Sequence, residues 1–298
     1  MAAKLPGTTT MCMYRWSNRQ TKKNGRTTWC FGYLKWKMLL SMRHFLRFLL
    51  FFSLLTATIP SFGSCTSEGI RIWPEENAIL PNQQFMVEGY ALDQVVARAI
   101  CKKYPVYLVS AEESVELEVL EICEGEFRLT QALLQPKTLL KQGLTYHLEI
   151  KNRGNDDAFT RYDFKLRQNV PPEWTVAKEA DRESPSWTTA PIEVERYYTM
   201  FGCGPSLGVS FAMACPSDQQ FRVRAEVRPV GKSKWTAYYL PVENGAVKIG
   251  HGMCSGAFLL EDAAEFEVQF TLVDMAGNQS KVWETPIRFK APTGEDEE

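Results

Sequence analysis

The sequence predicts an all-β fold, in which two tandem antiparallel β-sandwich domains follow an N-terminal signal segment. Apolar and polar residues alternate in four stretches, at 115–119, 144–150, 221–227 and 266–272. Alternation with a period of two places one face of a strand on a core and the other face in water. The only helical pattern is short, around 91–100. Several short strands separated by turn residues are typical of an antiparallel sandwich.

Residues 1–64 have the features of a basic leader and a secretory signal. No Asp or Glu precedes Glu68, whereas ten Lys and Arg residues do. An apolar run at 48–59 follows, and small residues then mark a cleavage site. A transmembrane helix is the alternative, but such a helix needs about 20 apolar residues, and Arg47 and Pro60 bound this run. We therefore expect an exported protein, located in the bacterial cell envelope (periplasm or outer surface) or secreted.

Cys65 has two interpretations. The stretch 62–65, Phe-Gly-Ser-Cys, resembles a bacterial lipobox, in which the cysteine becomes the lipidated first residue. The resemblance implies a lipid anchor at Cys65, although Phe62 stands where the motif usually has Leu. The alternative is cleavage after Gly63 or Ser64 by an ordinary signal peptidase, which leaves Cys65 able to form a disulfide. A lipid at Cys65 is the only membrane attachment that we expect of the mature protein.

Cleavage makes the protein acidic. The whole chain has 34 Lys and Arg against 35 Asp and Glu, and without the ten basic leader residues 24 remain against 35, a net charge of −11. A protein with this balance repels a phosphate backbone, so no nucleic-acid partner is expected. The acidic tail at 293–298 is predicted to be a solvated end.

The composition divides the mature part into two domains. Its length of roughly 230 residues suffices for two domains of about a hundred residues each. A polar, proline-bearing stretch at 169–191 is predicted to be a linker. The first sandwich is expected at 68–168 and the second at 192–292.

The first half resembles the bacterial Ig-like domains of surface and S-layer proteins over about residues 70–168. The residues that carry the resemblance are Pro74, Ala-Ile-Leu-Pro-Asn at 78–82, Phe-Met-Val at 85–87, Pro136, Leu139-Leu140 and Gly-Leu-Thr-Tyr at 143–146. The resemblance implies a β-sandwich with a role in display, adhesion or spacing, and it implies no catalysis.

The second half contains two turn motifs. Asn244-Gly245 is typical of a two-residue hairpin turn. Asp-Met-Ala-Gly-Asn at 274–278 resembles the turn near the last strands of Ig-like and fibronectin type III-like modules. This second resemblance also implies a β-sandwich.

The cysteines predict disulfides. Six of them follow the leader: Cys65, Cys101, Cys123, Cys203, Cys215 and Cys254. In an oxidising compartment an even number indicates disulfide pairing. The preferred pairs are Cys101 with Cys123, and Cys203 with Cys215 or Cys254, although spacing alone does not decide between pairings. If Cys65 carries a lipid, one of the other five must be free.

His251, Met253 and Cys254 lie close together in a glycine-rich stretch at 250–256 and are candidates for soft metal ligands. The favoured interpretation is a loop that Cys254 tethers through a disulfide, and the two interpretations exclude each other because a disulfide sulfur is a poor ligand. No catalytic set is assembled in the sequence, and no cofactor or metal is expected.

The expected function is therefore that of an exported, non-enzymatic binding or structural module, whose partner is a protein or glycan of the cell envelope. An accessory carbohydrate-binding protein is one alternative, with Trp174 and Trp187 of the linker either as an exposed platform or packed at the seam between the domains. A Cys/His metal-binding or hydrolytic protein that uses the loop around His251 is another.

Overall fold

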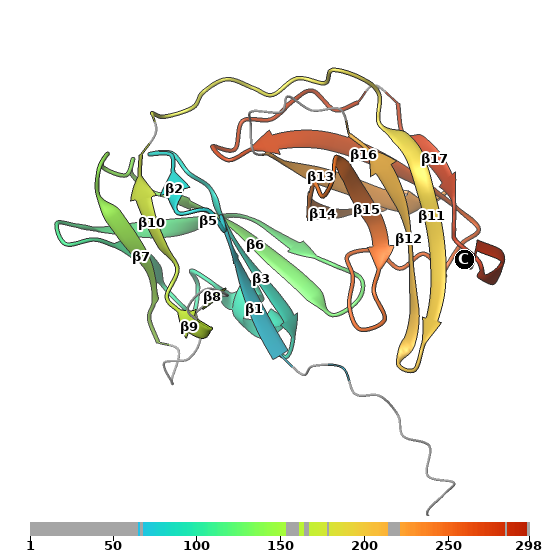
Figure 1. The fold of residues 1–298 in the computed structure, drawn as a ribbon, viewed down its shortest axis with the longest axis horizontal. Helices are drawn as coiled ribbons and strands as arrows, with labels where there is room; N and C mark the ends of the chain where they lie inside the picture. The colour runs from blue at the N-terminus through green and yellow to red at the C-terminus, as the bar shows by residue number, and fades with distance from the viewer. Residues whose placement is uncertain are drawn as a thin grey trace, which may run out of the picture. The chain divides into compact units, whose positions relative to one another are not determined.

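The computed structural model describes residue 65 and residues 68–152, 161–163, 167–177, 179–213, 221–283 and 285–296. The leader and Cys215 lie outside the described residues. The described part of the chain is all-β and almost entirely antiparallel, which confirms the predicted fold class (Figure 1). It belongs to one compact unit. Among the described residues, no helix is both long enough and apolar enough to cross a membrane.

The first sandwich contains the strands β1 (Glu68–Trp73), β2 (Ala78–Ile79), β3 (Phe85–Ala91), β4 (Val106–Val109), β5 (Ser114–Glu124), β6 (Leu129–Pro136), β7 (Thr145–Ile150) and β10 (Glu173–Val176). They form one continuous ladder in the order β1-β3-β6-β5-β4-β7-β10-β2. The helix α2 (Gln94–Ala99) occupies the segment that was predicted to be helical. The strands β8 (Arg161–Asp163) and β9 (Gln168–Val170) pair separately.

β5 lets this ladder curve around a core because it pairs with different strands along its length. Its first residues pair with β4, and its later residues pair with β6. The register shifts between Val119 and Glu121, and such a bulge bends a strand and increases its twist. The enclosed core consists of Ile72, Ile79, Phe85, Val87, Ile100, Val106, Leu108, Val115, Leu117, Ala132, Leu134, Leu140, Tyr146, Leu148, Trp174 and Val176.

Trp174 lies in this core, not in a linker. Its side chain is fully buried, and its Nε1–H donates to the Pro74 carbonyl at 3.0 Å. Its ring packs edge-on against Phe85, with 5.0 Å between the ring centroids. The strand that carries it, β10, pairs with β7 and β2. The prediction that Trp174 lies at a seam or on a platform is therefore wrong, and the stretch 169–191 contains a strand of the first sandwich.

The second sandwich has two facing sheets. Its strands are β11 (Ile192–Phe201), β12 (Gly204–Ala212), β13 (Phe221–Pro229), β14 (Thr236–Pro241), β15 (Ala246–His251), β16 (Glu265–Asp274) and β17 (Ile287–Lys290), and a short 3₁₀ helix η1 (Gly294–Asp296) follows. One sheet has the order β11-β12-β15 and the other β14-β13-β16-β17. Apolar side chains on their inner faces, such as Phe211, Val223 and Phe270, form the second core.

The predicted Asn244-Gly245 turn is confirmed, but it joins two sheets. Both residues have positive φ, 52° and 76°, as a two-residue hairpin turn requires. Glu243 and Ala246 exchange backbone hydrogen bonds of 2.9 and 3.0 Å across it. Beyond this bridge, β14 enters one sheet and β15 enters the other. The turn therefore forms a corner of the sandwich.

The Asp-Met-Ala-Gly-Asn turn contacts the first sandwich. Oδ1 of Asp274 accepts the N–H groups of Ala276 and Asn278 at 2.9 and 2.8 Å, which closes the turn. The Met275 carbonyl then accepts the Gln84 N–H at 2.8 Å. Gly277 has a φ of 89°, and a Cβ there would lie 2.0 Å from the Gln84 side chain. Glycine is thus required both by the backbone conformation and by the close approach of Gln84.

A buried polar seam, formed by Glu88, Gln131, Tyr238 and Tyr239, joins the two sandwiches. The Gln131 amide donates to Glu88 at 3.0 Å and to the Tyr239 carbonyl at 2.9 Å, and its oxygen accepts the Tyr239 N–H at 3.1 Å. The Tyr238 hydroxyl donates to Glu88 at 2.8 Å. Each buried side chain thereby has a partner from the other sandwich, which offsets the free-energy cost of removing polar groups from water.

Beside the polar seam lie an ion pair and apolar contacts. Glu121 of β5 accepts hydrogen bonds of 2.8 Å from both Arg224 of β13 and the Tyr239 hydroxyl. Met86, Cys123 and Leu133 of the first sandwich are buried in the core of the second. Separation of the two sandwiches would expose these apolar groups as well as break the polar contacts.

Replacement of Glu121 by Gln should lower the free energy of unfolding at pH 7 by on the order of 1–3 kcal/mol, because Arg224 loses a charged partner. Burial opposes ionisation of Glu121, but the hydrogen bonds from Arg224 and Tyr239 outweigh burial and lower its pKa. A lowered folded-state pKa stabilises the fold above the unfolded value, about 4.3, and this contribution is lost as the pH falls through the folded value.

Urea denaturation from pH 7 to pH 3 measures this effect. The difference between the wild type and E121Q should shrink at acidic pH. The control Glu149→Gln changes an exposed strand residue and should follow the wild type. A difference that stays constant over this pH range would contradict the role given to the Glu121 carboxylate.

Candidate functional site

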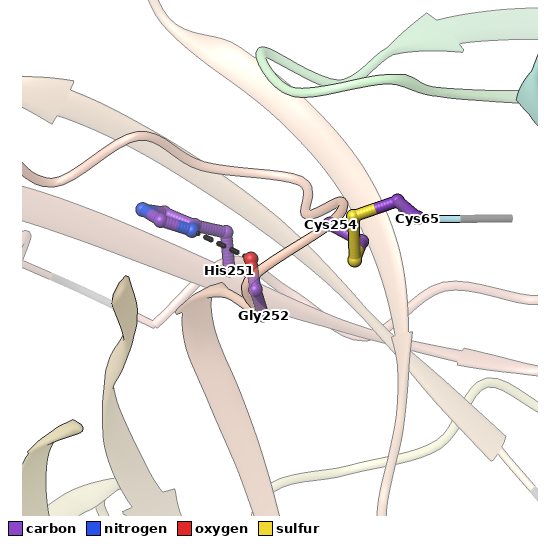
Figure 2. The surroundings of a disulfide bond; sticks show 4 residues. All are labelled: Cys65, His251, Gly252 and Cys254. Carbon is purple, nitrogen blue, oxygen red and sulfur yellow. Dashed lines mark hydrogen bonds between the residues drawn. A yellow bond between two sulfur atoms is a disulfide. The ribbon is translucent and has the colours of Figure 1, made fainter. Parts of the chain in front are cut away.

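The chemical feature that stands out is a disulfide between Cys65 and Cys254, which are 189 residues apart in the sequence (Figure 2). Their Cα atoms are 5.7 Å apart. Cys65 lies just before β1, and Cys254 lies in the loop between β15 and β16. The bond therefore ties the beginning of the first sandwich to a loop of the second.

Two glycines make possible the tight backbone turn of the loop that contains Cys254. The Gly252 N–H donates to the Ser255 carbonyl at 2.8 Å. A Cβ on Gly256 would lie 2.0 Å from the Cβ of His251, so only glycine fits there. Gly256 and Phe127 exchange backbone hydrogen bonds of 3.1 and 2.8 Å. These backbone hydrogen bonds therefore hold the loop against the first sandwich independently of the disulfide.

The His251 ring points away from the disulfide (Figure 2). Nδ1 lies 2.9 Å from the Gly252 carbonyl oxygen, and Nε2 lies 2.8 Å from a carboxylate oxygen of Glu261. The side chain is buried, and its ring meets Phe127 edge-on. Because both ring nitrogens already face oxygen acceptors, His251 does not form a ligand set with Cys254. The Met253 side chain is exposed.

A third sulfur, that of Cys203, lies beside the disulfide. Cys203 sits in the tight turn between β11 and β12. It is a free thiol, and its Sγ and those of Cys65 and Cys254 all lie within 4.8 Å of one another. All three residues are half-buried. We call these three residues the sulfur cluster.

The preferred pairing of Cys101 with Cys123 was wrong. Cys101 and Cys123 are both free thiols. Cys123 is buried in the second core, whereas Cys101 packs against the first. Cys254 bonds to Cys65, and Cys203 is free, so the pairing of Cys203 with Cys254 is also absent. The prediction that Cys254 tethers its loop through a disulfide is confirmed.

In this arrangement the Cys65 sulfur is not available for a thioether-linked lipid, because it is bonded to Cys254. Sequence reasoning missed this pair because it considered bonds within each half of the chain. The even number of cysteines after the leader was the one sequence feature consistent with a disulfide that includes Cys65.

A cleft of about 420 Å³ adjoins the sulfur cluster. Its walls come from β1, β3 and Leu129 of the first sandwich and from Cys254 and Ser255 of the second. The carboxylate of Glu88 and the guanidinium of Arg71 line it, 4.0 Å apart. Cys254 therefore borders a space that a small solute can enter.

Trp187, which the sequence analysis considered for glycan binding, does not form a flat platform with its aromatic neighbour. Trp187 packs against Trp283 at an interplanar angle of 81°, with 5.8 Å between the ring centroids, and its Nε1–H donates to the Lys281 carbonyl at 2.9 Å. Trp73 and Trp235 lie under Arg222 and Arg228. Stacking of a sugar needs an accessible ring face, and these contacts occupy ring faces and edges.

No protein-family profile matches the sequence, and no curated protein is significantly similar to it. Three similar solved structures are distant from this chain in sequence. A pullulanase from Anoxybacillus sp. LM18-11, solved with maltotriose, is 9% identical with a TM-score of 0.21 over 70% of this chain and 24% of its own. A DUF4785 family protein from Legionella pneumophila is 8% identical with a TM-score of 0.19 over 74% of this chain and 57% of its own.

The α-2-macroglobulin of E. coli is 10% identical with a TM-score of 0.21, over 78% of this chain and 14% of its own. The chain thus matches less than two thirds of the length of each of these proteins. Likenesses at these scores identify neither a family nor a function.

The free thiols of the described residues should differ in reactivity. Burial raises the pKa of the Cys101 thiol to about 11 and that of the Cys123 thiol to about 12. Because the thiolate is the reactive form, both should resist alkylation in the folded protein, whereas Cys203, in the turn between β11 and β12, should react.

Timed treatment with iodoacetamide at pH 8, followed by peptide mass spectrometry, measures the order of reaction. Cys203 should be modified first, and Cys101 and Cys123 only after urea is added. Modification of Cys123 in folded protein as fast as Cys203 would contradict its place in the core.

Proposed function

We propose that the protein is an exported, non-enzymatic binding module of the bacterial cell envelope. The observation that carries this proposal is the disulfide between Cys65 and Cys254. Disulfides form and persist mainly in oxidising compartments. Its first cysteine directly follows the segment with a basic leader and an apolar run, so the compartment suggested by the leader agrees with the chemistry of the bond.

Binding is favoured over catalysis by the state of the groups that an enzyme would use. Both His251 ring nitrogens face oxygen atoms, and the nearby Cys254 is oxidised. Cys101 and Cys123 have thiols whose pKa values are raised by burial. A nucleophile needs an adjacent base and access to substrate, and these residues do not provide that combination.

The strand β11 is the surface best suited to a partner. It has ten residues, and among the described residues it pairs with β12 alone, which makes it an edge strand of its sheet. Ile192, Val194, Met200 and Phe201 are 47–60% exposed along it. Long apolar edges are normally protected against pairing with other chains. We assign this edge to an extended segment of a partner protein, which adds a strand by backbone hydrogen bonds.

The charges beside β11 favour a basic partner segment. The exposed strand residue Glu195 lies within β11, and the acidic turn η1 lies against it. An apolar segment flanked by Lys or Arg would match both the exposed side chains and these carboxylates.

Expression of the full chain in a Gram-negative bacterium tests export. Mass spectrometry of the envelope fraction should find a protein that begins near residues 64–65, with Cys65 bonded to Cys254. A matched chain that lacks residues 2–64 should remain in the cytoplasm with both thiols reduced. Recovery from membranes of a protein that still carries residues 1–50, or of full-length protein in the cytoplasm, would contradict the proposal.

Photo-crosslinking in intact cells tests the binding edge. A crosslinking amino acid at Ile192 or Met200 should give one discrete heterologous adduct, which the substitution Val194→Lys should abolish. The same amino acid at Leu139, an apolar residue 58% exposed outside β11, should give none. Equal adducts at all three positions, no adduct at β11, or an adduct with a second copy of the chain would each contradict the assignment.

A further inference from the structure

We propose that the sulfur cluster is an internal thiol–disulfide exchange site, in which Cys203 displaces Cys65 from its bond with Cys254. The three sulfur atoms lie within 4.8 Å of one another, and Cys203 is a free thiol. A free thiol this close to a disulfide is the arrangement that exchange requires. The inference concerns the folded chain itself and does not depend on the binding edge at β11.

Sheet register explains why Cys254 is the sulfur attacked. β12 and β15 are antiparallel neighbours, and Leu207 stands opposite His251 at the end of the ladder. If the same antiparallel register is extended beyond the Leu207–His251 pair, the turn that contains Cys203 lies alongside the loop that contains Cys254. The Cβ position of Gly204 lies 3.7 Å from the Met253 carbonyl oxygen, so the two segments are in contact. Both belong to the second sandwich, so a bond between them requires only local movement.

The exchange step balances without an added oxidant or reductant. The Cys203 thiol loses its proton, and the thiolate attacks Sγ of Cys254. A bond forms between the sulfurs of Cys203 and Cys254 as the bond between Cys254 and Cys65 breaks. The electron pair leaves on the Cys65 sulfur, which takes up a proton.

The cluster favours exchange over metal binding in this state. Two of its three sulfur atoms are joined in a disulfide, and the thiolate is the form of cysteine that ligates metals. All three residues are half-buried, and Cys254, the residue attacked, also lines the adjoining cleft of about 420 Å³.

Exchange would change which parts of the chain the disulfide links. The bond between Cys65 and Cys254 spans both sandwiches, whereas a bond between Cys203 and Cys254 lies within the second one. β1 would keep its pairing with β3, but the segment before β1 would lose its covalent tie. The Cys65 thiol, released at the start of the first sandwich, could then form a disulfide with a thiol of another protein.

Disulfide mapping of the full chain tests this proposal. Wild-type protein held at pH 8 without reductant is quenched with acid, alkylated with N-ethylmaleimide and digested. Two crosslinked peptide pairs are expected, one joining Cys65 to Cys254 and one joining Cys203 to Cys254. The second pair should be lost in Cys203→Ser, and both should persist in the control Cys101→Ser.

A second variant, which removes the displaced cysteine, also tests whether Cys203 can form a bond with Cys254. In Cys65→Ser, oxidised glutathione should convert Cys203 and Cys254 into an internal disulfide, seen as the loss of two free thiols without a glutathione adduct. The far-ultraviolet circular dichroism of each variant reports whether it folds, and the wild-type map tests the proposal even if a variant does not.

The proposal is overturned if wild-type protein contains only the bond between Cys65 and Cys254 at pH 8. It is also overturned if Cys254 of Cys65→Ser accumulates as a glutathione adduct, or if native Cys203 is bonded to Cys215. Three unoxidised thiols at positions 65, 203 and 254 would overturn it together with the export proposal.

Discussion

The buried hydrogen bonds between Gln131, Glu88 and the tyrosines of β14 are the constraint on which the arrangement of the two sandwiches depends. Buried amide and carboxylate groups must find partners, and here each sandwich supplies the partners of the other. A geometry that specific fixes one orientation, whereas apolar contacts alone tolerate several. Met86 and Leu133 then add apolar burial in the second core.

The disulfide between Cys65 and Cys254 reinforces this arrangement from another side. It closes a loop of 189 residues. In the chain-entropy account, a crosslink over so long a loop restricts the unfolded chain and so raises the free energy of unfolding by about 5 kcal/mol. Exchange at Cys203 would remove this covalent tie but leave the polar contacts of the seam in place, because no residue of the seam belongs to the sulfur cluster. The covalent link between the two sandwiches can thus be lost without loss of the contacts that pack them together.

The sequence was informative where the signal is local. Alternation at 115–119, 144–150, 221–227 and 266–272 identified parts of β5, β7, β13 and β16, because a period of two follows from strand geometry. The Asn244-Gly245 turn was equally clear, since few residues adopt its backbone conformation. That it joins two different sheets depends on long-range packing and could not be inferred from its residues.

What the sequence could not reveal was long-range pairing. β10 is four residues long and follows two prolines, so its alternation is too brief to recognise, and only its pairing with β7 and β2 makes Trp174 a core residue. The disulfide escaped notice for a related reason, since its cysteines lie in different halves of the chain. The sulfur cluster likewise arises from three segments that only the fold brings together.

The seam and the disulfide together are expected to make the two sandwiches one cooperative unit. Differential scanning calorimetry of residues 65–298 tests it most directly, with the oxidised and the reduced protein compared. We expect one transition in the oxidised protein, with equal calorimetric and van't Hoff enthalpies, and a lower melting temperature after reduction. Two separate transitions whose midpoints do not change on reduction would contradict it.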